Sequence, residues 1–204
     1  MEEAIKLRGV TSLLHFTAEK NLDSIINNGL IPRKIIHKFI SEAVFNDDYR
    51  LYRRDLYNSF SIGFPNYSMF YKYRKIKSDL KFCVIGFSTD ILLNEDCLFC
   101  YTNAANSCIS NLDESELKGK DAFLKMFDDN IGDLKRSDLN LPDNFPTDHQ
   151  AEVLVYGYVD PKYIIGVCFD DFNLYQEYTR KYPYLKIAYS SYYYNNRKYA
   201  LESK

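Results

Sequence analysis

A carboxylate stands at the start of a predicted strand in the tract Gln150-Ala151-Glu152. The tract follows residues 132–148, which are rich in Asp, Asn and Pro and are expected to form a long, functional loop. Side chains two apart on a strand point to the same face, so Gln150 and Glu152 share one face. A carboxylate there is either exposed at the rim or placed in a cleft. In a cleft it would stabilise developing positive charge or accept a proton.

A second set of polar side chains lies near the N-terminus. His15 and Thr17 are two apart at the end of a predicted strand, residues 13–16, and Asn21 follows in a predicted helix, residues 18–28, which Thr17 is expected to cap. These three donors and acceptors suit a polar ligand such as a ribose or an amide. A purely structural role for the histidine is the alternative.

Two adjacent arginines, Arg53 and Arg54, precede a predicted strand at residues 59–64. A guanidinium makes paired, charge-assisted hydrogen bonds to phosphate oxygens, so a pyrophosphate is a natural ligand for either of them. A surface charge pair is the alternative.

The formal net charge of −2 argues against an extended, sequence-independent DNA-binding surface. A nucleic-acid contact would therefore be a short groove or a pocket for one base. Lys135 and Arg136 could meet phosphates in such a short footprint, and some of the 19 tyrosines could stack on bases. Packing in the core is the alternative use of these rings.

Several common site types are absent from the sequence. It has no phosphate-cradling Gly-rich loop, no Gly-x-Ser-x-Gly motif and only three histidines, so a His-rich metal site is not expected. Cys97 and Cys100 have metal-ligand spacing but lie in an apolar run without a second close pair, which predicts buried thiols. We predict no bound metal.

The chain is expected to be cytoplasmic. It contains no run of 18 apolar residues, and its acidic N-terminus lacks the basic and apolar regions of a signal peptide. Its five cysteines, an odd number, argue against a disulfide framework.

The pattern of predicted elements indicates one α+β domain over residues 1–204, with a split, mostly antiparallel β-core and outer helices. Strands are expected at residues 13–16, 59–64, 82–87, 97–101, 150–157, 163–169 and 185–189, and helices at 18–28, 34–43, 68–74, 103–110, 121–129 and 171–181.

Taken in order, these pieces resemble the DarT family of DNA base ADP-ribosyltransferases. The resemblance runs from near residue 13 to near residue 170, and the order and spacing of the tracts carry it. The tracts are Leu13-Leu14-His15-Phe16-Thr17 with Asn21 and Gly29-Leu30, Arg54 with residues 59–71, Tyr101-Thr102-Asn103-Ala104-Ala105, and residues 150–155.

The resemblance implies an ADP-ribosyltransferase fold that binds NAD as co-substrate across the split sheet. Glu152 would be the catalytic carboxylate, and Arg54, or Arg53, would meet the pyrophosphate and position NAD. The remaining NAD contacts implied in this way come from His15, Thr17 and Asn21 at the nicotinamide ribose, Leu30 lining the pocket, and Tyr71 near the nicotinamide.

The same resemblance implies single-stranded DNA as the acceptor, presented by the loop at about residues 139–149. The base must be unstacked to be reached, which favours single strands. The implied DNA-contacting residues are Gln150, which would steer the target base, His149 in the loop, Tyr67 stacking on a neighbouring base, and Lys135 and Arg136 at phosphates.

One tract departs from the thymidine-modifying members of the family, which carry a Pro-Arg-Ser-Pro-Met-Leu-Tyr type of sequence. This chain has Pro65-Asn66-Tyr67-Ser68-Met69-Phe70-Tyr71 instead, so it is closer to the branch linked to guanine, with thymine as the alternative base. The resemblance further implies a bacterial toxin of a toxin–antitoxin or phage-defence system, with a macrodomain-type or related ADP-ribosyl hydrolase as antitoxin.

Two other functions stay open at this point. An ADP-ribosyltransferase acting on RNA or protein would share the NAD site and differ in the substrate loop. A nucleic-acid-binding module without catalysis would use its tyrosines for stacking and would not turn over NAD.

Overall fold

The computed structural model describes residues 1–36 and 54–202. Its centre is a seven-stranded sheet with the order β4-β7-β2-β1-β3-β8-β9. All neighbouring strands in it are antiparallel except β8 and β9, which are parallel. The strands are β1 (Leu13–Ala18), β2 (Tyr57–Ile62), β3 (Phe82–Phe87), β4 (Cys97–Cys100), β7 (Glu152–Tyr156), β8 (Ile164–Phe169) and β9 (Ile187–Tyr189).

The sheet divides into two halves between β1 and β2. These two strands pair at Leu13–Ile62 and Leu14–Ser61, whereas β1 pairs with β3 along all of its six residues, from Leu13 to Ala18. The halves β4-β7-β2 and β1-β3-β8-β9 therefore meet over a short contact. This confirms the α+β class with a split, mostly antiparallel β-core.

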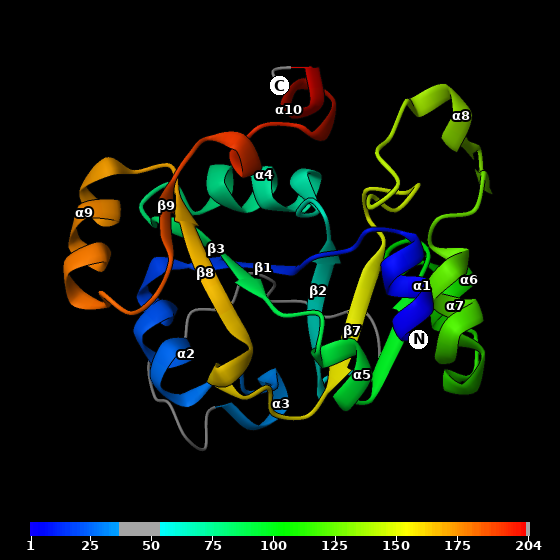
Figure 1. Cartoon of the computed structure of the whole chain (residues 1–204), viewed down its shortest axis with the longest axis horizontal. Helices are drawn as coiled ribbons and strands as arrows, with labels where there is room; N and C mark the ends of the chain where they lie inside the picture. Colours follow the sequence, from blue (N-terminus) through cyan, green and yellow to red (C-terminus); the bar gives the residue numbers. More distant parts are fainter. Residues whose placement is uncertain (37–53, 203–204) are drawn as a thin grey trace.

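Helices lie around the sheet (Figure 1). In that view α2 and α9 lie at the β8–β9 end, and α1, α6 and α7 at the β4–β7 end. The α-helices are α1 (Glu2–Leu7), α2 (Leu22–Asn28), α3 (Arg33–Ile36), α4 (Tyr67–Ile76), α5 (Ile91–Asn94), α6 (Ser107–Ser110), α7 (Gly119–Lys125), α8 (Arg136–Leu139), α9 (Phe172–Lys181) and α10 (Arg197–Glu202), with 3-10 turns η1 (Glu19–Asn21), η2 (Glu114–Leu117), η3 (Pro161–Tyr163) and η4 (Tyr192–Tyr194).

Both faces of the sheet are buried, because successive side chains on a strand point to opposite sides. On β1, Leu13 packs in the main core with Phe60 and Ile85. Its neighbour Leu14 packs on the other side with Phe70 of α4. Helix α4 therefore covers the face of the sheet opposite the main core.

Two local predictions are wrong. Thr17 does not cap a helix: β1 continues to Ala18, because Thr17 and Ala18 pair with Cys83 and Phe82, and the chain then turns through η1 before α2 begins. Residues 132–148 are not one irregular loop. They include β6 (Leu134–Lys135), which pairs with β5 (Asn130–Ile131), and then α8.

Other predictions hold in part or fall outside the described residues. Cys97 and Cys100 are buried free thiols, as predicted. The helix expected at 34–43 is seen as α3 up to Ile36; its remainder and Arg53 lie outside the described residues. Within residues 1–36 and 54–202, no helix is long and apolar enough to cross a membrane. The same residues contain no group of three or more His, Cys, Asp or Glu side chains that could hold a metal ion.

Candidate active site

Glu152 opens β7, between β4 and β2, directly after the loop that carries Gln150. Its side chain is buried, with 5% exposure, so the alternative of a solvated glutamate at a strand start is wrong. One carboxylate oxygen accepts a hydrogen bond from the backbone N–H of Ala104 at 3.1 Å. Since burying a carboxylate is costly without such partners, the tract around Ala104 supports Glu152 in this position.

Arg54 lies on the same side of this half-sheet as Glu152. Its side chain is 8% exposed, and Nη2 is 3.5 Å from the carbonyl oxygen of Leu112. Both charges act on the buried thiol of Cys100, which pairs with Glu152 across β4 and β7. Burial raises the pKa of Cys100 to about 12, the Glu152 carboxylate adds to the rise, and Arg54 opposes it. The structure thus brings the predicted catalytic carboxylate and the predicted NAD-positioning arginine to one neighbourhood.

His15 and Thr17 lie on β1, and Asn21 follows in η1. The Nδ1 atom of His15 is 2.9 Å from the carbonyl oxygen of Ser59 on β2, so this nitrogen carries a proton, because a carbonyl only accepts. Asn21 donates from Nδ2 to Oγ1 of Thr17 at 2.9 Å. His15 is thus held at the junction of the two half-sheets, and Thr17 and Asn21 are held to each other at the far end of β1.

Strand β2 connects the segments that carry His15 and Glu152. The carbonyl oxygen of Ser59 accepts the hydrogen bond from His15. Ser59 also pairs with Leu154 of β7, which lies two residues after Glu152. The segments led by His15 and Glu152 thus lie on strands separated only by β2. That one NAD molecule spans both segments stays a prediction.

Leu30 and Tyr71, the other predicted NAD contacts, lie in different surroundings. Leu30 is buried in the main core and exchanges backbone hydrogen bonds of 2.9 Å with Val159. Tyr71 is on α4 with 57% exposure and lines a surface pocket. Their roles at NAD stay predictions.

The loop before β7 is fastened from two sides. From α8, Arg136 donates to the carbonyls of Phe145 at 2.6 Å and Pro142 at 2.7 Å. From α10, Arg197 donates to the carbonyls of Pro146 at 2.8 Å and Thr147 at 3.0 Å. Arg136 is thus engaged by protein carbonyls, and its neighbour Lys135 is the exposed cation of the pair predicted to meet DNA phosphates.

The end of this loop is held by further side chains. Asp148 accepts hydrogen bonds from Thr102 Oγ1 at 2.5 Å and from the N–H of Gln150 at 2.8 Å. His149 stacks on Tyr67, with ring centroids 4.6 Å apart, and its Nε2 lies 3.0 Å from Oγ of Ser68. Burial lowers the pKa of His149, Asp148 opposes this shift, and Arg197 adds to it. Two of the predicted DNA contacts, His149 and Tyr67, therefore touch each other.

Arg197 and Asp148 are not among the predicted site residues, and Thr102 stands only in a family-like tract, without a role. Arg197 lies 45 positions after Glu152 in the printed sequence, in no motif, and only folding places it at the loop. Asp148 carries a local signal, since an aspartate two residues before a backbone N–H often accepts from it in a turn.

The combined geometry suits glycosyl transfer. A buried carboxylate near a cation can stabilise positive charge at a sugar carbon, and a fixed set of hydroxyl, amide and imidazole groups can hold polar parts of a dinucleotide. The loop that precedes Glu152 is held by hydrogen bonds from Arg136 and Arg197. That this donor set binds NAD and that the loop presents an acceptor stay predictions.

Comparisons with known proteins agree with this geometry. Residues 14–199 match the family model described as "DarT: ssDNA thymidine ADP-ribosyltransferase, DarT". A search of curated proteins finds no match.

Solved structures share the fold. Thermosipho africanus DarTG in complex with ADP-ribose superposes with a TM-score of 0.63 and 16% identity, covering 90% of this chain and 51% of that chain, so the present chain spans about half of its length. Thermus sp. 2.9 DarT in complex with NAD+ gives a TM-score of 0.54 at 13% identity and covers 91% of this chain and 98% of that one. The same Thermus DarT in complex with ADP-ribosylated ssDNA gives 0.53 at 14% identity, covering 92% and 97%.

The sequence match covers most of the chain, and the fold and the buried carboxylate at the start of β7 agree with it. The chain belongs to the DarT family of single-stranded DNA ADP-ribosyltransferases.

Proposed function

We propose that this protein transfers ADP-ribose from NAD to a base in single-stranded DNA, with Glu152 as the catalytic carboxylate. The observation that carries the proposal is the burial of Glu152 at the start of β7, where its carboxylate accepts a hydrogen bond from the Ala104 N–H, in a chain that matches the DarT family. Thermus DarT, which has the same fold, is known in complex with NAD+ and with ADP-ribosylated ssDNA.

Each residue group has a separate task in this proposal. NAD supplies the ADP-ribosyl group, with nicotinamide as the leaving group. Glu152 stabilises positive charge at the ribose and accepts the proton that the attacking base nitrogen loses. Arg54 binds the pyrophosphate and keeps that half of NAD in place, while His15, Thr17 and Asn21 hold the ribose side.

Glu152→Gln tests the assignment, because it keeps the shape of the side chain and removes its charge and basicity. Transfer of labelled ADP-ribose to a single-stranded oligonucleotide should fall at least about 100-fold, the lower end of a general-base contribution. Glu177→Gln, on the exposed side of α9, is the matched control and should keep full activity. Retained transfer by a folded Glu152→Gln protein would end the assignment.

The acceptor is tested in the same assay by competition. Single-stranded DNA, RNA and protein acceptors of equal concentration separate the proposed function from transfer to RNA or protein. Nicotinamide release excludes the binding module without catalysis.

The modified base is proposed from the tract at residues 65–71, which favours guanine. The family description names thymidine, so thymine is the alternative. Mass spectrometry of modified oligonucleotides that contain only one of the two bases distinguishes them.

A role as a toxin is part of the proposal. Thermosipho DarTG, of which this chain spans about half the length, is the structural neighbour that suggests it. We propose that a macrodomain-type or related ADP-ribosyl hydrolase acts as the antitoxin. Co-expression of such a hydrolase should restore growth of cells that express the protein, while a catalytically inactive hydrolase should not.

A further inference from the structure

A pocket of about 380 Å³ lies between α4 and the segment that follows β9. Its volume is in the range of small-molecule sites in proteins. Five of its lining side chains are aromatic, among them Tyr67, Tyr71 and Tyr193, and the amides of Asn195 and Asn196 lie at its wall. Tyr67 and Tyr71 already carry predicted roles at DNA and NAD, whereas Tyr193, Asn195 and Asn196 have no assigned role.

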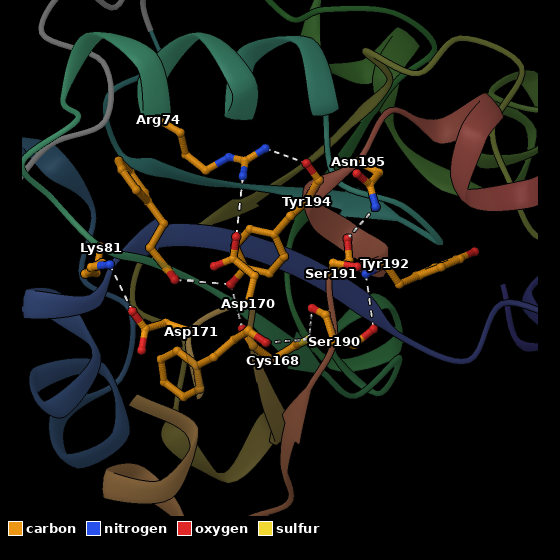
Figure 2. Close-up of polar contacts among 12 residues, drawn as sticks. Arg74, Lys81, Cys168, Asp170, Asp171, Ser190, Ser191, Tyr192, Tyr194 and Asn195 are labelled. Carbon is orange, nitrogen blue, oxygen red and sulfur yellow. Dashed lines mark hydrogen bonds and ion pairs between the residues drawn. The ribbon is translucent and has the colours of Figure 1, made fainter. Parts of the chain in front are cut away.

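The walls of the pocket are fixed by buried contacts. The hydroxyl of Tyr194 lies within hydrogen-bond distance of the carbonyls of Phe82, at 3.1 Å, and Cys168, at 2.9 Å. From α4, Arg74 donates to the carbonyl of Tyr194 (Figure 2). Its guanidinium lies 4.7 Å from the ring centroid of Phe70 and 5.2 Å from that of Tyr194. The pocket is therefore preformed.

The pocket adjoins the proposed substrate loop. Tyr67 and Ser68 belong to its lining, and both contact His149, by stacking and by a hydrogen bond. His149 precedes Gln150, and the loop leads directly into Glu152. A strand whose target base reaches Glu152 would pass this pocket with a neighbouring nucleotide.

The chemistry of the lining favours a base over a phosphate. The cation at the pocket, Arg74, is already paired with Asp170 at 3.6 Å, as Figure 2 shows. Aromatic rings offer stacking faces that any base can use, and asparagine amides can both donate to and accept from a base edge. A nucleobase satisfies both kinds of group at once.

We propose that this pocket binds the unstacked base of a nucleotide next to the modified one, and that Tyr193 and Asn195 contact it. The inference rests on the proposed function and adds a second contact site for the same DNA strand. It makes ADP-ribose transfer depend on the presence of a base at one position next to the modified base.

The test uses the full-length protein and single-stranded oligonucleotides with one modifiable base. An abasic site is placed at each neighbouring position in turn, and kcat/KM of ADP-ribose transfer is measured. Stacking of one base on an aromatic ring predicts that kcat/KM of the wild type falls about 5- to 150-fold when the abasic site lies at one particular position. In Tyr193→Ala, kcat/KM on the intact strand should fall by a similar factor, and the abasic site should then lower it little further. Tyr193→Phe keeps the stacking ring and should restore the wild-type kcat/KM.

Two controls separate the pocket from general damage. Tyr184→Ala, at a highly exposed tyrosine, is the control for Tyr193→Ala. Asn173→Ala, at an exposed asparagine on α9, is the control for Asn195→Ala, which removes the other proposed base contact. Both controls should keep wild-type kcat/KM on every oligonucleotide. Nicotinamide release from NAD without DNA should stay unchanged in the pocket variants, which shows that the fold and the NAD site are intact.

The outcomes separate this inference from the proposed function. If the wild type transfers ADP-ribose but no neighbouring abasic site reduces transfer, the inference is wrong and the proposed function stands. The inference is also wrong if an abasic site lowers kcat/KM of the wild type and of Tyr193→Ala by equal factors. If the wild type transfers ADP-ribose to no oligonucleotide, the proposed function fails and this inference with it.

Discussion

Arg197 connects the C-terminal helix α10 to the loop before β7, and its removal should loosen that loop. The guanidinium donates to the carbonyls of Pro146 and Thr147 at 2.8 and 3.0 Å, and the side chain is 8% exposed. Burial lowers its pKa to about 10, so it stays charged at neutral pH. Both carbonyls belong to buried residues, and they would lose a charged donor in Arg197→Leu.

The size of the effect follows from these two bonds. A hydrogen bond to a charged group contributes about 1.5–3 kcal/mol, so two contribute about 3–6 kcal/mol. Removing the buried charge also removes its desolvation cost, which offsets part of the loss. We expect the free energy of unfolding to fall by about 3 kcal/mol. For a domain of this size the Tm should then fall by about 6–12 °C.

Thermal unfolding followed by circular dichroism measures the change. Lys198→Leu is the matched control, because the next side chain along α10 is 87% exposed and its ion-pair contact with Glu202 is 4.0 Å long. It should change the free energy of unfolding by less than about 0.5 kcal/mol. A Tm for Arg197→Leu within about 2 °C of the wild type would refute the reasoning that the two bonds fix the loop.

Three further predictions concern the same loop. Asp148→Asn should destabilise the protein by about 2 kcal/mol in urea unfolding, because Thr102 and the Gln150 N–H lose a charged acceptor; an unchanged midpoint would contradict this. Burial lowers the pKa of His149 below 6.5, so its neutral form stabilises the fold above that pH, and this stability is lost as pH falls through the lowered value. The Tm should therefore drop less between about pH 7.5 and 5 in His149→Gln than in the wild type, and equal drops would count against the assignment. Gly63→Ala should lower the free energy of unfolding by more than about 2 kcal/mol, because φ is +72° and a Cβ would lie 2.5 Å from the Phe145 ring and 2.8 Å from the Asn144 carbonyl oxygen. Gly132→Ala is the control. Its φ is +56° and the space around it is open, so the free energy of unfolding should fall by only about 1–2 kcal/mol.

The sequence by itself determined the elements that carry the site. Alternating apolar side chains predicted the strand that Glu152 opens, and the period of two placed His15 and Thr17 on one side of β1. The order of short tracts along the chain indicated the family, and the family match over residues 14–199 confirms it. These features are local, so a linear pattern is enough to find them.

Tertiary structure decided what each side chain touches. The sequence left Glu152 either exposed or in a cleft, and its burial depends on β4, β2 and the tract at Ala104, which are distant along the chain. The predicted cap at Thr17 failed because pairing with β3 extends the strand by two residues. Arg136 donates to loop carbonyls and Arg197 fastens the same loop from the C-terminus. Backbone carbonyls are the same in every sequence, so only the folded chain shows which guanidinium reaches them.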